Sequence, residues 1–153
     1  MSLTDYSLTS RMRYADFLIK NKDYKSLEEE SKKMKELDNV NPRILRYLGY
    51  SAYENGNVDA ALDALQKFIL NPANKIISSD YLYLGQAKIK KGISADGRSV
   101  DQVLLASAFE DFNKAISMEP SVLKEFSELG KNYFTLKLYN VSAFLFGHAI
   151  ESV

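Results

Sequence analysis

Few residues in this chain could carry covalent or acid–base chemistry. His148 is the only histidine, and there is no cysteine. A nucleophile needs a base and a stabilising group beside it, and no Gly-x-Ser-x-Gly turn is present to partner this histidine. One histidine without cysteine also cannot complete a closed zinc site, which takes four ligands. The sequence therefore predicts that the chain is not an enzyme and holds no metal, and nothing in it indicates a cofactor.

The segment 92–99, GISADGRS, matches a phosphate-binding P-loop except that Arg98 stands in place of the lysine. A genuine P-loop follows a strand, and its lysine reaches the terminal phosphates of a nucleotide. This segment follows a predicted helix. A glycine-containing loop that leads into a capped helix is therefore the favoured interpretation.

Two acidic clusters and one triplet complete the candidates. The runs Glu28-Glu29-Glu30 and Glu110-Asp111 are predicted to lie on solvated helix faces rather than to act as paired catalytic acids. Asn140-Val141-Ser142 matches the N-glycosylation pattern, which would matter only in a secreted eukaryotic chain.

The composition is that of an ordinary globular chain of 153 residues, with 46% hydrophobic and 26% charged side chains. Lys and Arg number 20, as do Asp and Glu. Zero net charge argues against general nucleic-acid binding, because phosphate neutralisation needs a basic excess. No apolar run reaches the roughly 18 to 20 residues that span a bilayer, so no membrane insertion is expected. The first residues lack the basic and apolar regions of a signal peptide, and the compartment stays open.

An internal repeat organises the chain. A large residue followed by a small one recurs at Tyr14-Ala15, Leu48-Gly49, Leu84-Gly85 and Leu129-Gly130. The small residues are separated by 34, 36 and 45 positions, and the first two intervals match one helix-turn-helix unit. In the second unit, apolar and small residues lie at i, i+3, i+4 and i+7, which is one face of a helix: Leu45, Leu48, Gly49 and Ala52. The chain is therefore predicted to be all-α.

Glycines inside these predicted helices indicate close helix–helix approach. Gly49, Gly85 and Gly130 each cost roughly 1 kcal/mol relative to alanine, which is explained if a neighbouring helix leaves no room for a side chain. Helix starts are predicted at Asn41-Pro42 and at a capping box formed by Ser99-Val100-Asp101-Gln102. Asn55-Gly56-Asn57 predicts a tight turn between helices.

The third interval exceeds the first by 11 residues (45 − 34). Gly92 is predicted to end the first helix of the third unit, and the second helix carries Ala108, Phe112 and Ala115. The excess lies between them, at residues 93–103. Repeat arrays tolerate such insertions because each repeat contacts only its neighbours.

These units resemble the tetratricopeptide repeat family, whose signature is a bulky residue, Leu-Gly, an aromatic, Ala-x-x-x-Phe and a proline. The third unit has Tyr81, Leu84-Gly85, Ala108, Phe112, Ala115 and Pro120, and the fourth has Phe126, Leu129-Gly130, Tyr133, Tyr139, Ser142, Phe146 and Ala149. The resemblance covers nearly the whole chain. It implies a right-handed α-solenoid of about four helix-turn-helix repeats in a single array over residues 1–153. The repeats are placed at about 8–41, 42–77, 78–122 and 123–153; the first is degenerate and the third carries the insertion.

In this family the first helix of each repeat lines a concave groove that binds peptides. The resemblance implies a groove lined by aromatic, basic and amide side chains: Arg43, Arg46, Tyr47, Tyr50, Tyr53, Tyr83, Gln86, Lys90, Lys124, Lys131 and Phe134. Tyrosine offers a large contact area, and arginine grips a carboxylate bidentately. An acidic or aromatic peptide, or a protein that presents one, is the expected ligand. Packing against neighbouring helices is the alternative interpretation for any single tyrosine.

Some relatives use a two-carboxylate clamp, made of lysine, arginine and asparagine, to grip the acidic tails of heat-shock chaperones. Here Arg46 and Lys124 keep the positive charge, but Tyr50 and Tyr83 stand at asparagine positions and Glu128 replaces a cation. The clamp is incomplete, so binding of chaperone tails is not expected.

The expected function is a non-enzymatic protein–protein interaction scaffold. One alternative is a structural assembly or self-association segment that uses the uncovered C-terminal helix face around Phe144-Leu145-Phe146; this face also predicts that the chain is part of a longer protein or pairs with another copy. A further alternative is a chaperone of the secretion type that holds apolar segments. The first unit, with Arg11 and the charged run 28–33, is predicted to be a polar end of the array.

Overall fold

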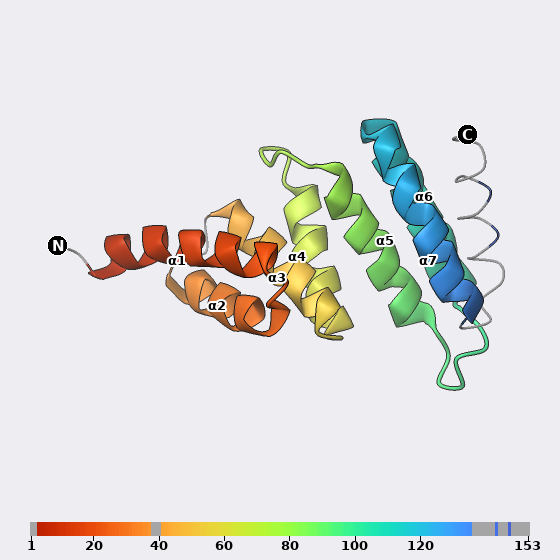
Figure 1. The fold of residues 1–153 in the computed structure, drawn as a ribbon, viewed down its shortest axis with the longest axis horizontal. Coiled ribbons are helices and arrows are strands. Elements are labelled where there is room, and N and C mark those ends of the chain that lie inside the picture. The colour runs from red at the N-terminus through yellow and green to blue at the C-terminus, as the bar shows by residue number, and fades with distance from the viewer. Residues whose placement is uncertain (1–2, 38–40, 136–142, 144–146, 148–153) are drawn as a thin grey trace. The chain divides into compact units, whose positions relative to one another are not determined.

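The computed structural model describes residues 3–37, 41–135, 143 and 147. The helices in these ranges are α1 (Leu3–Lys20), α2 (Tyr24–Leu37), α3 (Pro42–Glu54), α4 (Val58–Leu70), α5 (Ser78–Gly92), α6 (Gln102–Met118) and α7 (Leu123–Thr135), with a 3-10 turn at Pro120–Val122 (Figure 1). No β-strand occurs among the described residues. The all-α prediction is confirmed. None of the helices in this part of the chain combines the length and the apolarity that crossing a bilayer requires.

The helices group into two compact units, residues 1–76 and 77–153. In the first unit α1 packs against α2, α2 against α3, and α3 against α4. In the second unit α5 packs against α6, and α7 contributes side chains to their shared core. The number of repeats, their boundaries and the handedness of the array stay predictions.

The first unit repeats its burial pattern with the 34-residue offset found in the sequence. Buried residues 34 positions apart are Ala15 and Gly49, Leu18 and Ala52, Leu27 and Ala61, and Ser31 and Leu65. The two helical hairpins of this unit therefore turn the same positions toward the core.

Local signals explain where α3 and α6 begin and how the chain turns from α3 into α4. Asn41 caps α3 by accepting a hydrogen bond from the Arg43 backbone N–H at 3.0 Å, and proline follows at the first helical position, as predicted. The turn between α3 and α4 contains Gly56 at φ +86°, a conformation that glycine adopts without steric cost. The predicted capping box at Ser99 is wrong. Asp101 is the cap instead, because its carboxylate accepts from the N–H groups of the second and third helical residues, at 2.9 and 3.0 Å.

The connection between α5 and α6 runs from residue 93 to residue 101, so the last two residues of the predicted insertion belong to α6. Ile93 and Val100 form an isolated antiparallel bridge, and the Asp101 N–H donates to the Gly92 carbonyl at 2.8 Å. Val100 is buried in the core of the second unit. The loop is therefore closed at its base. That it is an insertion into a repeat stays a prediction.

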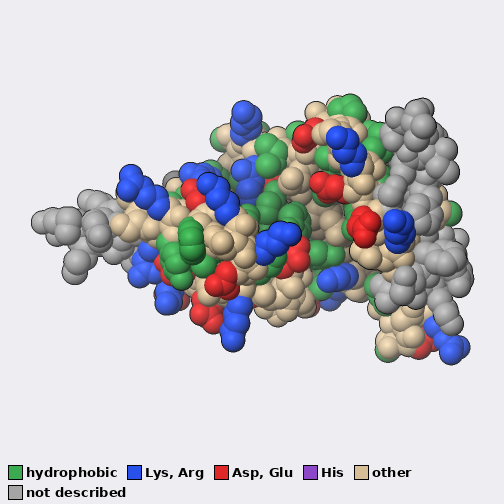
Figure 2. Space-filling model, viewed as in Figure 1, with side chains coloured by type: hydrophobic (Ala, Val, Ile, Leu, Met, Phe, Trp, Pro, Cys, Tyr) green, Lys and Arg blue, Asp and Glu red, His purple; other side chains and the backbone are tan. Residues whose placement is uncertain are grey.

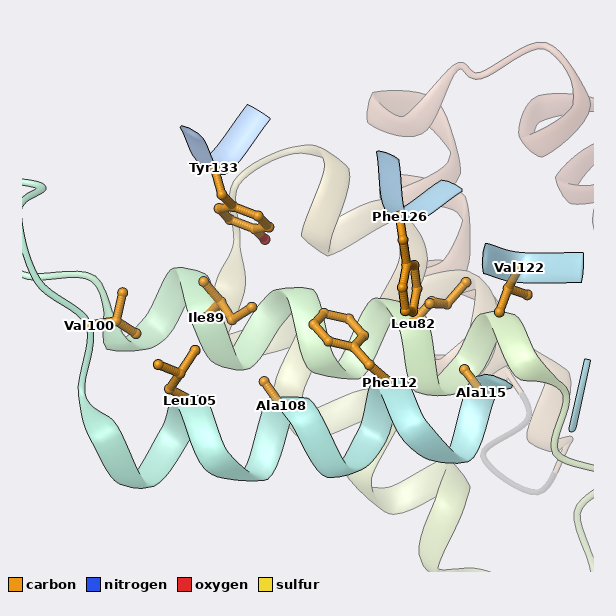
Figure 3. Close-up of a cluster of buried hydrophobic side chains, with 10 residues drawn as sticks. All are labelled: Leu82, Ile89, Val100, Leu105, Ala108, Phe112, Ala115, Val122, Phe126 and Tyr133. Atoms are coloured by element: carbon orange, nitrogen blue, oxygen red, sulfur yellow. The ribbon is translucent and has the colours of Figure 1, made fainter. Parts of the chain in front are cut away.

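Glycine permits a close helix contact in each unit. A Cβ at position 49 would lie 2.6 Å from Leu65 Cγ, and a Cβ at position 85 would lie 2.7 Å from Phe112 Cε1. Both distances are far below van der Waals contact, so the predicted close approach is confirmed at these two positions. Figure 3 shows Phe112 of α6, Leu82 of α5 and Phe126 of α7 pointing toward one another. The rings of Phe112 and Phe126 meet edge to face, with centroids 5.7 Å apart.

The prediction that both acidic clusters are solvated is wrong for three of their residues. Glu28, Glu30 and Asp111 are buried, whereas Glu29 and Glu110 are exposed. Each buried carboxylate has nitrogen partners that the linear sequence does not reveal. Glu30, for example, accepts from the guanidinium of Arg11 at 2.8 Å.

Glu28 illustrates how such burial is stabilised. It accepts hydrogen bonds from the side-chain amides of Asn55, at 2.9 Å, and Asn57, at 2.8 and 2.9 Å. The Nζ atom of Lys32, on the next turn of α2, lies 3.6 Å from Glu28 Oε2. Burial acts to raise the pKa of Glu28, but the two amides and the lysine outweigh it, and the pKa lies below its usual value. The carboxylate therefore holds α2 against the turn that joins α3 to α4.

We expect Gly49→Ala to destabilise the chain by about 1–3 kcal/mol, because the added methyl group meets a fully buried leucine. The sign of this change in stability is diagnostic of the close contact, since the same substitution on an exposed helix face would stabilise the chain by roughly 1 kcal/mol. Urea denaturation measures the change. Combining the substitution with Leu65→Ala should cost less than the sum of the two single changes. A stabilised Gly49→Ala variant would contradict the close approach.

We expect Glu28→Gln to lower the free energy of unfolding at neutral pH by about 1–3 kcal/mol, because an NH2 group then replaces one oxygen of a buried, charged acceptor that two asparagine amides share. A lowered folded pKa means that the stabilisation is present above the ordinary value of 4.5 and is lost as the pH falls through the folded value. The gap between the wild type and the variant should therefore shrink below about pH 4.5.

The matched control for this prediction is Glu29→Gln, one residue away and exposed. It should change the stability by no more than about 0.5 kcal/mol. Equal pH dependence in the wild type and in Glu28→Gln, measured by denaturation from pH 7 downward, would rule out the proposed role of the carboxylate.

Candidate functional site

The predicted groove residues on α3 divide into a buried and an outer set. Tyr47, Tyr50 and Tyr53 are buried. Arg43 is exposed and Arg46 is half-buried. The tyrosine rings therefore pack within the first unit, and the two guanidinium groups lie outside them.

Arg43 is held by a small polar network that joins α1 to α3. Its Nη2 donates to the Asp16 carboxylate, at 3.1 Å, and to the Tyr47 hydroxyl, at 2.6 Å. The same hydroxyl donates to Asp16. The guanidinium also lies over the Tyr47 ring, 5.6 Å from its centroid. Burial, together with the hydrogen bond to Asp16, raises the pKa of Tyr47 to about 12, so the phenol stays protonated at neutral pH.

Arg46 lies on the same face of α3 as Arg43 but is held by different partners. Its Nη2 donates to the Lys75 carbonyl at 2.9 Å, and its guanidinium lies 4.6 Å from the centroid of the Phe68 ring. These two contacts hold the planar guanidinium in one orientation. Arg43 and Arg46 are three positions apart, so both cations occupy one side of α3.

The remaining predicted groove residues belong to the second unit. Tyr83 and Gln86 are half-buried on α5, and the amide of Gln86 donates to the Leu82 carbonyl at 3.3 Å. Lys90, Lys124 and Lys131 are exposed, and Lys131 lies 3.9 Å from Glu128. The side chain of Phe134 lies outside the described part of the structure.

A buried polar cluster between α5 and α6 resembles a serine–lysine pair. Lys88 Nζ donates to Ser107 Oγ at 2.7 Å and lies 2.7 Å from Asp111 Oδ2. Burial raises the pKa of Asp111, and the ammonium group of Lys88 opposes this rise. Asp111 Oδ2 has no well-directed hydrogen bond, so the ammonium charge is its main compensation. A lysine that compensates a buried carboxylate is a structural ion pair rather than a general base.

The P-loop-like segment folds on itself. The N–H groups of Gly97, Arg98 and Ser99 donate to the Ser94 carbonyl, the Asp96 carboxylate and the Ser94 hydroxyl, at 2.9, 3.0 and 3.2 Å. A phosphate loop must keep such N–H groups open for its ligand. The segment therefore forms a closed turn, and the loop leads into the capped helix α6, in keeping with the favoured interpretation.

Several predictions concern residues outside the described part of the chain. These are His148, the triplet at residues 140–142 and the apolar run at residues 144–146. Among the residues that the structure does describe, no three His, Cys, Asp or Glu side chains converge in a way that could hold a metal ion.

The sequence analysis missed Asp16, which orients both Arg43 and Tyr47. No local signal pointed to it, because 27 and 31 residues separate it from its partners. The shared repeat offset would have placed Asp16 at the position on α1 that corresponds to Tyr50, a predicted groove residue of α3 (16 + 34 = 50).

No family model matches the sequence, and no curated protein matches it either. Solved structures do match. The crystal structure of MamA is similar over 95% of this chain and 77% of that protein, with 21% sequence identity and a TM-score of 0.65. The C-terminal part of a TPR repeat-containing protein from Cytophaga hutchinsonii is similar over 90% of this chain, with 22% identity and a TM-score of 0.67; the match spans 49% of that protein. The chain therefore has the fold of the tetratricopeptide-type helical-repeat proteins.

Proposed function

We propose that this chain is a non-enzymatic scaffold that binds a partner protein or peptide through the first helices of its hairpins. The observation that carries the proposal is the pair of arginines on α3. Arg43 and Arg46 each lie over an aromatic ring and each make a hydrogen bond that fixes the guanidinium. Cations ordered before binding lose little side-chain entropy when a ligand arrives.

The chemistry of these cations favours an acidic ligand. A guanidinium group recognises a carboxylate through parallel N–H donors, and both arginines lie on the outer side of buried tyrosines. In the second unit, Lys90, Lys124 and Lys131 add exposed positive charge to α5 and α7. We therefore propose acidic peptide segments, with aromatic residues that can contact the same face, as the ligand class.

The tyrosines take a supporting part in this proposal. Because Tyr47, Tyr50 and Tyr53 are buried in the chain alone, they set the position of α3 and present little surface to a ligand. A substitution such as Tyr50→Ala would report on packing as well as on binding. Substitutions of the arginines are the sharper test.

We expect the double variant Arg43→Gln, Arg46→Gln to bind acidic–aromatic peptides at least about tenfold more weakly than the unaltered chain, because interface arginines are frequent hot spots. A library of such peptides, titrated against the purified chain and followed by fluorescence anisotropy, measures the change. Circular dichroism checks that both chains are equally folded.

The matched control is Lys35→Gln, Lys67→Gln, which removes two exposed cations from α2 and α4 of the same unit. It should leave the affinity unchanged if the arginines are specific. Equal weakening by both double variants would indicate a general charge effect, and unchanged binding by the arginine variant would contradict the proposal.

A further inference from the structure

The outer side of α1 breaks the repeat pattern of the first unit. Positions 47, 48 and 51 on α3 are Tyr, Leu and Ser, and all three are buried. Their counterparts 34 residues earlier are Arg13, Tyr14 and Phe17. All three counterparts are exposed, with Tyr14 at 46% and Phe17 at 59%. The same helix face is thus covered on α3 and open on α1.

The cover on α3 is a helix. α2 packs against α3, and Tyr47 shares a core cluster with Leu27 and Met34 of α2. These two residues are seven positions apart, so they lie on one stripe of α2. The acidic residue beside them, Glu28, is anchored on the polar turn that follows α3. The cover therefore combines an apolar stripe with a carboxylate at its edge.

The open face on α1 combines an apolar strip with two exposed cations. The rings of Tyr14 and Phe17 stack with a centroid distance of 6.5 Å and an interplanar angle of 16°, and they form an apolar strip. Arg13 and Lys20, one at each end of the strip, are exposed cations. Figure 2 shows hydrophobic side chains over α1, with Lys and Arg side chains on the same face.

We propose that the α1 strip, made of Arg13, Tyr14, Phe17 and Lys20, docks an amphipathic helix of a partner protein that carries an apolar stripe flanked by acidic residues. Such a helix would take the place on α1 that α2 takes on α3. The strip is a second binding surface, separate from Arg43 and Arg46, so its test stands apart from that of the groove.

The two cations of the α1 strip favour a partner helix with acidic edges over a second copy of the chain. Two α1 helices paired antiparallel would bring Arg13 of one copy near Lys20 of the other, and like charges in contact disfavour association. A partner with glutamate or aspartate at its edges meets two cations instead. Apolar burial supplies affinity, and the charges set orientation and partner choice.

The test uses the full chain and a dye-labelled synthetic helical peptide with leucines at i, i+3 and i+7 and glutamates on both flanks. A second peptide has lysines in place of the glutamates. Fluorescence anisotropy should show that the glutamate peptide binds the unaltered chain, and that Phe17→Ser weakens binding by at least about tenfold. Serine is the residue that the repeat offset places at this position on α3, and Phe17 is exposed, so the variant should fold.

Two controls separate the strip from other surfaces. Leu70→Ser removes another exposed hydrophobic side chain of the first unit, 79% exposed on α4, and should leave binding unchanged. The charge control Lys35→Gln, Lys67→Gln should also leave it unchanged, because both lysines are exposed and belong to neither proposed surface. Arg13→Glu, Lys20→Glu should reverse the preference, so that the lysine peptide binds more tightly than the glutamate peptide.

Three results would overturn the proposal. The first is no detectable binding of the glutamate peptide to the unaltered chain. The second is binding that Phe17→Ser and Leu70→Ser weaken equally. The third is light scattering that shows a dimer of the unaltered chain that Phe17→Ser converts to a monomer, because a second copy would then be the occupant.

Discussion

Close helix–helix contact at glycine is the constraint on which the rest of each unit depends. Gly49 lets Leu65 of α4 press against α3, and Gly85 lets Phe112 of α6 press against α5. Once these contacts fix the relative position of the two helices in each hairpin, they also fix the directions in which the other side chains point. The tyrosines of α3 are buried in the first unit, and the ring of Phe112 packs edge to face against the ring of Phe126 on α7. A glycine inside a helix lowers the helix propensity. The tight packing of large side chains that it permits compensates for this loss of stability.

Buried charges then define the junctions between helices. Glu28 links α2 to the turn after α3, Glu30 links α2 to α1, and Asp111 links α6 to α5. A carboxylate removed from water is tolerated only where nitrogen donors or cations meet it in good geometry. Each of these acids therefore requires one arrangement of two elements. Leu27 and Met34 supply apolar burial nearby, but apolar contacts alone would permit small shifts between the helices.

Helix packing also determines which side chains the two surfaces proposed for binding expose. On α3 the tyrosines are used for packing, and the cations that remain outside are ordered by the aromatic rings and by Asp16. On α1 the positions that correspond to the covered face of α3 are exposed, and they carry Tyr14 and Phe17. An arginine pair ordered over rings suits carboxylates. An aromatic strip between two cations suits an amphipathic helix with acidic edges.

The sequence by itself determined the helical class, the 34-residue offset of the first unit, the cap at Asn41 and the close approach at Gly49 and Gly85. These features depend on local chemistry or on repetition, both of which are visible along the chain. The tertiary structure alone decided which acids are buried, because Glu28 differs from Glu29 only in the side of α2 that it occupies. It also decided that Asp101 rather than Ser99 caps α6, since the bridge at Val100 fixes where the helix can begin. It likewise decided that Phe17 is exposed whereas Ser51, 34 positions later, is buried, because a linear sequence does not state which helix faces will be covered.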